Sequence, residues 1–168
     1  MPLVPAGRNT NARSVFNRIN AGVNQAVALG LQRVGNAIVI EATKSLVHHK
    51  PYAKKATGEL LSKFFVVLDK RSLTVNVGNS SLHAVNVEYG RAPGKKPPPP
   101  KDIQDWLIAK GLPSDPRTVF LMGRKIAKYG IKPVPFMRDA IDKVTQRVPE
   151  IINAAVDDYL NKEGVKRT

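Results

Sequence analysis

Apolar residues recur every three or four positions over the first quarter of the chain, from Phe16 to Ala42 through Val23, Val27 and Val34. This spacing predicts one long helix that Asn11 or Ser14 can cap and that ends near residue 49. The apolar spacing is sustained over about eight turns, which corresponds to a rod roughly 45 Å long. Three glycines within it lower helix propensity by up to about 1 kcal/mol each, so the helix needs packing partners or a bend.

Apolar and polar side chains alternate in the middle of the chain. Three runs that favour strands cover residues 60–68, 73–77 and 85–89. Short connections separate them, and we therefore expect an antiparallel meander of three strands with one face on the long helix. Gly90 marks the end of the third strand.

Helical spacing returns in the last third of the chain. We expect helices over 102–111 and 117–128, and a final helix from Phe136 to Tyr159 that Pro149 kinks by removing one backbone hydrogen bond. No internal repeat is expected. The whole pattern predicts an α+β fold in a single domain over 13–162, with tails at 1–12 and 163–168.

Residues 90–101 form a basic, proline-rich arm within this domain. Pro97 to Pro100 favour a stiff polyproline II conformation, and Arg91, Lys95 and Lys96 lie at its base. A strand edge that opens into a rigid basic arm indicates contact with another molecule.

Charge is the strongest compositional signal. The 168 residues contain 27 Lys and Arg against 13 Asp and Glu, a net charge of +14. Residues 44–101 carry eleven basic and three acidic residues. Such clustering indicates a polyanionic partner or an acidic protein face, although any single lysine can simply be solvated. The candidate residues for this interface are Lys50, Lys54, Lys55, Arg91, Lys95, Lys96 and Lys101.

The sequence lacks the signatures of catalysis. It has no cysteine, which excludes disulfides and thiolate sites, and it contains no phosphate-binding glycine loop or metalloprotease motif. Adjacent His48 and His49 point roughly 100° apart on a helix and suit the helix end better than a metal. Glu88 is expected to form a salt bridge to Arg91 or a nearby lysine. We therefore expect no enzyme, no cofactor, no metal and, without a spanning apolar run, no membrane association.

Four segments in order resemble the tail-completion, or head-tail joining, family of long-tailed double-stranded DNA bacteriophages, also labelled minor tail proteins. They are Ala-Thr-Gly-Glu-Leu-Leu-Ser at 56–62, Val-Gly at 77–78, His-Ala-Val-Asn-Val-Glu-Tyr-Gly at 83–90 and Pro-Val-Pro-Phe-Met-Arg-Asp-Ala at 133–140. The resemblance covers about 15–160. Its motif residues are Thr57, Gly58, Leu60, Glu88, Tyr89, Gly90, Pro135, Phe136 and Ala140.

This sequence departs from the family pattern in three places. His83 stands where tyrosine is common, Pro51 lies farther from Thr57 than usual, and the insertion over 93–116 is long.

The resemblance implies a non-enzymatic virion protein that assembles in the host cytoplasm. It would form a ring, expected to be a hexamer, around the DNA channel. The ring's partners would be the head connector or stopper, the tail terminator or tail tube, and double-stranded DNA bound without sequence preference. Two alternatives remain: a free-standing basic DNA-binding protein, and another neck part such as a tail terminator or connector stopper.

Overall fold

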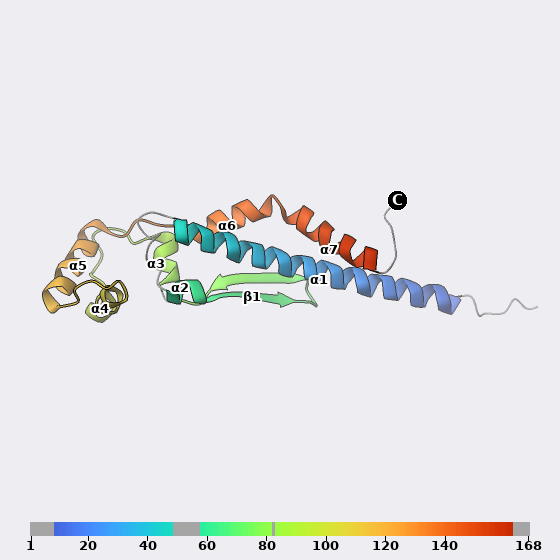
Figure 1. The fold of residues 1–168 in the computed structure, drawn as a ribbon, viewed down its shortest axis with the longest axis horizontal. Helices are drawn as coiled ribbons and strands as arrows, with labels where there is room; N and C mark the ends of the chain where they lie inside the picture. The colour runs from blue at the N-terminus through green and yellow to red at the C-terminus, as the bar shows by residue number, and fades with distance from the viewer. Residues whose placement is uncertain (1–8, 49–57, 82, 163–168) are drawn as a thin grey trace, which may run out of the picture. The chain divides into compact units, whose positions relative to one another are not determined.

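The computed structural model describes residues 9–48, 58–81 and 83–162 (Figure 1). Two strands and seven helices make up this part of the chain. In order they are α1 (Asn9–His48), α2 (Gly58–Ser62), β1 (Phe64–Asp69), β2 (Thr74–Asn79), α3 (Ala84–Tyr89), α4 (Pro100–Ala109), α5 (Pro116–Tyr129), α6 (Phe136–Thr145) and α7 (Val148–Lys162). The predicted α+β class and the long first helix are confirmed. α1 begins at Asn9, so residues 9–12 of the expected tail are helical.

The chain divides into two compact units. The first comprises the described residues of 1–37, 66–76 and 144–168, and the second comprises those of 38–65 and 77–143. α1 and the two strands contribute residues to both units.

In the first unit, α1 packs on α7 through glycines. A Cβ atom on Gly30 would lie 3.1 Å from the Cα of Ile152, and one on Gly22 would overlap the ring of Tyr159. Ala26 and Ala155 are buried nearby in the same unit. The glycines that weaken α1 as an isolated helix therefore let α7 approach closely, which supplies the predicted packing partner.

The strands β1 and β2 form a two-stranded antiparallel sheet. Side chains alternate as predicted, with Phe65 and Val67 exposed between less exposed neighbours. The carboxylate of Asp69 closes the turn by accepting the backbone N–H of Arg71 at 2.8 Å and the hydroxyl of Ser72 at 2.7 Å.

Two parts of the predicted meander are wrong. Residues 58–62 form the short helix α2, so β1 begins only at Phe64, and residues 84–89 form the helix α3 instead of a third strand. In α3 the buried residues are Ala84 and Glu88, four positions apart, whereas Val85 is exposed. A valine alternation of two residues is too short to distinguish a strand from one helical turn, and the contacts of Ala84 and Glu88 decide for the helix.

The core of the second unit lies where α1, α2, α3 and α6 meet. Its buried residues are Ala42, Leu46, Leu60, Ala84, Phe136 and Ala140. The rings of Phe64 and Phe136 pack edge to face with their centroids 5.9 Å apart.

The helices at 102–111 and 117–128 are confirmed with small shifts, but the final helix is two helices. α6 ends at Thr145 and α7 starts at Val148. Pro149 lies in the first turn of α7, where a missing backbone N–H costs little, so this proline stands near a helix start and does not kink a continuous helix.

Asp115 caps the N-terminus of α5. Its carboxylate accepts the backbone N–H groups of Arg117 and Thr118, both at 3.1 Å, and the hydroxyl of Thr118 at 2.5 Å. The bond from the Thr118 hydroxyl is the largest of the effects that lower the pKa of Asp115 below its ordinary value.

Acidification should weaken this cap. Because the pKa of Asp115 is lower in the folded chain, its contribution is complete above the unfolded pKa of about 3.9 and is lost as the pH falls through the folded value. We expect the wild type to have a higher unfolding midpoint than Asp115→Asn at neutral pH, and the difference to shrink in acid. Thermal unfolding of both proteins at a series of pH values tests this, and two parallel profiles would contradict it.

Candidate interaction surface

Residues 94–129, here called the helical hairpin, are the part of the second unit that lies between two paired segments of the chain. Arg91 and Ile131 form an isolated antiparallel bridge, in which each N–H donates to the other's carbonyl, at 2.8 and 2.9 Å. We call residues 90–93 and 130–133 the hairpin base. It fixes where the hairpin starts and ends.

The two segments of the hairpin base have the same sequence pattern. Tyr-Gly-x-x-Pro occurs at 89–93, after α3, and again at 129–133, after α5. Gly90 has φ 69° and ψ −164°, and Gly130 has φ 70° and ψ −165°. No internal repeat was expected, and the signal for this short one is the recurrence of Tyr-Gly-x-x-Pro itself.

The expected basic arm folds back on itself. The guanidinium of Arg91 donates a hydrogen bond to the carbonyl of Lys96, and the N–H of Gly94 donates to the carbonyl of Ala127 at 2.7 Å. Arg91 is half-buried, while Lys95, Lys96 and Lys101 are exposed. The extended conformation is confirmed at Pro99, with φ −52° and ψ 136°, but Pro100 already begins α4. Arg91 therefore shapes the loop, and the three lysines remain available to a partner.

The other predicted cations lie outside the described residues. These are Lys50, Lys54 and Lys55, together with the motif residue Thr57. Their role as a polyanion-facing connector stays a prediction.

The expected salt bridge of Glu88 is replaced by a helix cap. Its carboxylate accepts the backbone N–H of Met137 at 2.9 Å and that of Arg138 at 3.1 Å, both in the first turn of α6. Glu88 is buried, with 7% of its surface exposed. A carboxylate at this position satisfies two N–H groups that no helix can satisfy internally and complements the positive end of the helix.

Loss of this cap should destabilise the second unit. Removing the carboxylate in Glu88→Ala leaves two N–H groups without an acceptor, and we expect a loss of about 2–3 kcal/mol in the free energy of unfolding. Glu88→Gln keeps one acceptor oxygen and should lose less. Asp139→Asn, which changes an exposed carboxylate in the same turn, should change stability by at most about 0.5 kcal/mol. Urea unfolding followed by circular dichroism measures all three, and equal losses for Glu88→Ala and the Asp139 control would disprove the cap.

Most motif residues that carry the family resemblance gather around this cap. Leu60, Phe136 and Ala140 belong to the same core, and Glu88 binds the start of the helix that carries the last two. Pro135 precedes that helix, and its carbonyl accepts the N–H of Asp139 at 2.9 Å. Gly90 belongs to the hairpin base. Two motif residues are exposed, namely Gly58 and Tyr89.

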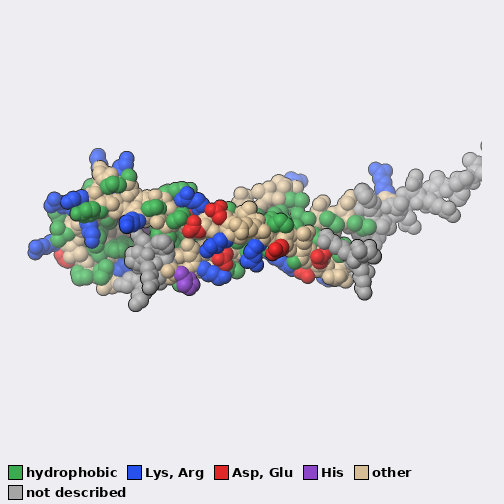
Figure 2. Space-filling view, turned by 90° about the horizontal axis from the view of Figure 1, so that it is seen from above, with side chains coloured by type: hydrophobic (Ala, Val, Ile, Leu, Met, Phe, Trp, Pro, Cys, Tyr) green, Lys and Arg blue, Asp and Glu red, His purple; other side chains and the backbone are tan. Residues whose placement is uncertain are grey.

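The helical hairpin presents a basic and apolar surface. Figure 2 shows Lys and Arg side chains gathered around hydrophobic ones over α4 and α5, with few acidic side chains among them. α5 contains no acidic residue, and exposed side chains recur along it at helical spacing, among them Arg117, Phe120, Leu121, Arg124, Lys125 and Lys128. The opposite side of α5 is held by a small core with α4, formed by Ile103, Leu107 and Val119.

Aromatic rings on the hairpin pair with cations. Lys110 lies 5.8 Å from the ring centroid of Trp106, Arg124 lies 5.8 Å from that of Phe120, and Lys128 lies 5.2 Å from that of Tyr129. All of these pairs lie outside 44–101, the range in which the sequence concentrates its positive charge.

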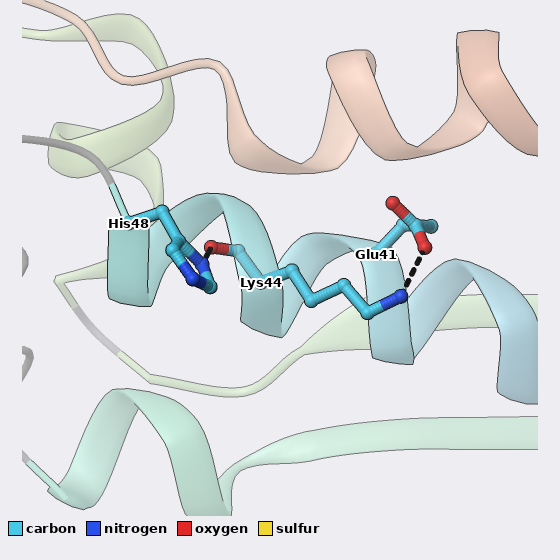
Figure 3. A network of polar contacts seen from close by, with 3 residues as sticks. All are labelled: Glu41, Lys44 and His48. Atoms are coloured by element: carbon cyan, nitrogen blue, oxygen red, sulfur yellow. Dashed lines mark hydrogen bonds and ion pairs between the residues drawn. The ribbon is translucent and has the colours of Figure 1, made fainter.

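His48 ends α1 in a helix-end contact (Figure 3). Its Nδ1–H donates to the carbonyl of Lys44 at 2.9 Å, and the ammonium of Lys44 pairs with Glu41 at 2.8 Å. His49 lies outside the described residues. Within 9–48, 58–81 and 83–162, no three His, Asp or Glu side chains are grouped so that they could hold a metal ion.

None of the helices in the described part of the chain has both the length and the apolar character that a bilayer crossing requires. The chain was also compared with known proteins. No protein-family model, no curated protein and no solved structure matches it.

Proposed function

We propose that this chain is a structural subunit of a bacteriophage neck, which completes the tail and joins it to the head connector as a ring around the DNA channel. One observation carries the proposal. Motif segments that are far apart in the sequence, at 56–62, 83–90 and 133–140, supply Leu60, Glu88 and Phe136 to one core and its helix cap. Residues that build a common core are those that a family of divergent structural proteins must retain.

The surface chemistry supports the same proposal. A subunit with a net charge of +14 would give a ring a strongly positive field, suited to DNA in its channel or to an acidic neighbouring ring. The exposed Lys95 and Lys96 lie on a loop that the Arg91–Ile131 bridge holds in place, and the exposed Lys101 lies in the first turn of α4. A loop that is ordered before docking loses little conformational entropy when it binds.

Light scattering of the purified chain, at low and high salt and with or without double-stranded DNA, tests the assembly. A defined ring, or a monomer that joins to purified tails, is the expected result. A small species that neither forms a ring nor joins tails would overturn the proposal.

Neutralising the three exposed lysines around the proline run should separate assembly from folding. The triple change of Lys95, Lys96 and Lys101 to Gln is expected to leave the unfolding midpoint unchanged, because exposed lysines contribute little to stability, and to reduce tail joining. Arg91→Gln is the contrasting variant, since it removes the bond to Lys96 and should lower stability. Thermal unfolding and a tail-joining assay measure the two effects. Unchanged joining by the triple variant would contradict a role for these lysines in docking.

The acid-free face of α5 favours one other function, a free-standing DNA-binding protein. Such a protein would remain a monomer or dimer and would bind duplex DNA with an affinity that falls steeply with salt. The same light-scattering series distinguishes the two.

A further inference from the structure

A groove opens in the helical hairpin between the proline run and the two helices. It has a volume of about 520 Å³, and its walls include Pro97–Pro100, Ile103, Val119, Phe120, Gly123 and Arg124. This volume is within the range of sites that bind small ligands or a few side chains of a peptide. The walls are mainly apolar, and Arg124 supplies a cation.

The walls of this groove are held in place before any partner binds. Ile103 and Val119 belong to the core between α4 and α5. Gly123 is buried, and a Cβ atom there would lie 3.2 Å from Ile103 and 3.5 Å from Pro97. The helices and the proline run therefore meet closely at Gly123. Prolines add stiffness, so binding here would require little ordering of the chain.

Phe120 gives the groove an unused apolar contact. Its side chain lines the groove and 63% of its surface is exposed, with the guanidinium of Arg124 stacked 5.8 Å from the ring centroid. An exposed aromatic residue on the wall of an apolar groove is typical of an interaction site, where the partner's apolar side chain removes it from water.

The charge around the groove is positive. Residues 94–129 contain eight Lys and Arg and three Asp. One of these aspartates, Asp115, is engaged in capping α5. A partner with carboxylates next to its apolar side chains therefore complements the groove in both charge and polarity.

We propose that this groove binds an acidic peptide segment of another protein, which inserts an apolar side chain beside Phe120 and sets carboxylates against Arg124 and against Lys96 and Lys101, the lysines at the two ends of the proline run. This proposal stands on the hairpin alone and holds whether or not the chain is a neck subunit.

The chain's own segments are poor candidates for the groove. The segments outside the described residues at 1–8 and 49–57 contain basic residues and no acidic one, and 163–168 contains one acidic and two basic residues. Duplex DNA would satisfy the cations through its phosphates, but its bases stay stacked inside the duplex and would leave the apolar walls without a partner.

Selection from a library of short random peptides against the full-length chain tests the proposal. The enriched peptides are expected to be acidic and to contain a large apolar residue. One of them is then synthesised with a fluorescent label, and its dissociation constant is measured by anisotropy. Enrichment of no peptide, or of basic or purely polar peptides, would overturn the proposal.

Two matched pairs of variants locate the binding. Phe120→Ser should weaken binding by about tenfold or more, the loss typical of a central apolar contact. Leu121→Ser changes the next exposed residue, which is not part of the groove wall, and should leave the affinity within about twofold. Arg124→Gln should likewise weaken binding more than Lys125→Gln.

Because all four residues are exposed, the variants should retain the helix content of the wild type by circular dichroism. Equal losses within each pair would place the peptide elsewhere and disprove the proposal. Displacement of the peptide by a short DNA duplex, with both ligands losing affinity in Phe120→Ser, would reassign the groove to nucleic acid.

Discussion

Alanine at Gly90 or Gly130 is expected to disrupt the hairpin base and to lower the free energy of unfolding by about 4 kcal/mol. Of this loss, about 1–3 kcal/mol is backbone strain, and the rest follows from the lost bridge between Arg91 and Ile131. Both glycines combine a positive φ near 70° with an extended ψ, a region that is essentially restricted to glycine. A Cβ atom on Gly90 would collide with the carbonyl of Ile131 and lie 2.8 Å from the nitrogen of Pro133. A Cβ atom on Gly130 would collide with the carbonyl of Arg91.

The atoms in the way are backbone atoms, which cannot rotate aside as a side chain can. To make room, Arg91 and Ile131 would have to separate, and both hydrogen bonds of their bridge would be lost. The helical hairpin would then lose its fixed attachment. Compared with the wild type, the variants should migrate more slowly on a native gel and be cleaved faster by a protease. Urea unfolding measures their lower stability.

Two other glycines serve as controls for backbone strain alone. Gly94 and Gly111 also have positive φ, at 79° and 63°, but a Cβ atom on either would meet nothing within 4 Å. Gly94→Ala and Gly111→Ala should each cost about 1–2 kcal/mol. If all four substitutions destabilised the protein equally, the close approach of the two backbone segments in the hairpin base would have no energetic role.

The pattern of apolar residues predicted the elements whose period extends over many residues. The spacing in α1 covers about eight turns, and the alternation in β1 covers six residues, so one misplaced side chain changes neither assignment. Residues 84–89 contain only one helical turn and a half. So short a segment does not distinguish the strand period of 2 from the helix period of 3.6, and the contacts of Ala84 with the core decided the structure.

The chemistry of Glu88 could not be predicted from its neighbours in sequence. Its hydrogen-bond donors are 49 and 50 residues away, on α6, whereas Arg91, the predicted partner, binds Lys96. A lone acid in a basic region suggests an ion pair when only local sequence is considered. A buried carboxylate at a helix N-terminus becomes visible only when α3 and α6 are brought together.

The groove in the hairpin was hidden for a different reason. Pro97–Pro100 suggested an arm that leaves the molecule, since proline runs are common in linkers. The structure instead uses them as a wall against α5, with Pro97 close to Gly123. The sequence did carry a signal for this, because α5 exposes Phe120 and Leu121 on the same face as its cations.

Phe136→Ala should also be among the most destabilising substitutions, at a cost of about 3–5 kcal/mol. Phe136 is 1% exposed and is the largest fully buried side chain in the described part of the chain. It lies in the core with Leu46 and Leu60 and meets the ring of Phe64 edge to face. Truncation would remove these contacts and leave a cavity next to the helix that Glu88 caps.

Phe120→Ala is the matched control, since it makes the same chemical change at a residue with 63% of its surface exposed, and it should change stability by less than about 0.5 kcal/mol. A double-mutant cycle of Phe64→Ala and Phe136→Ala, measured by urea unfolding, should give a coupling of about 0.5–1.5 kcal/mol for the ring pair. Because Phe136 acts through the core, tail joining should fall only as the folded fraction falls. A Phe136→Ala protein that is fully folded and yet fails to join tails would move this residue from the core to an interface.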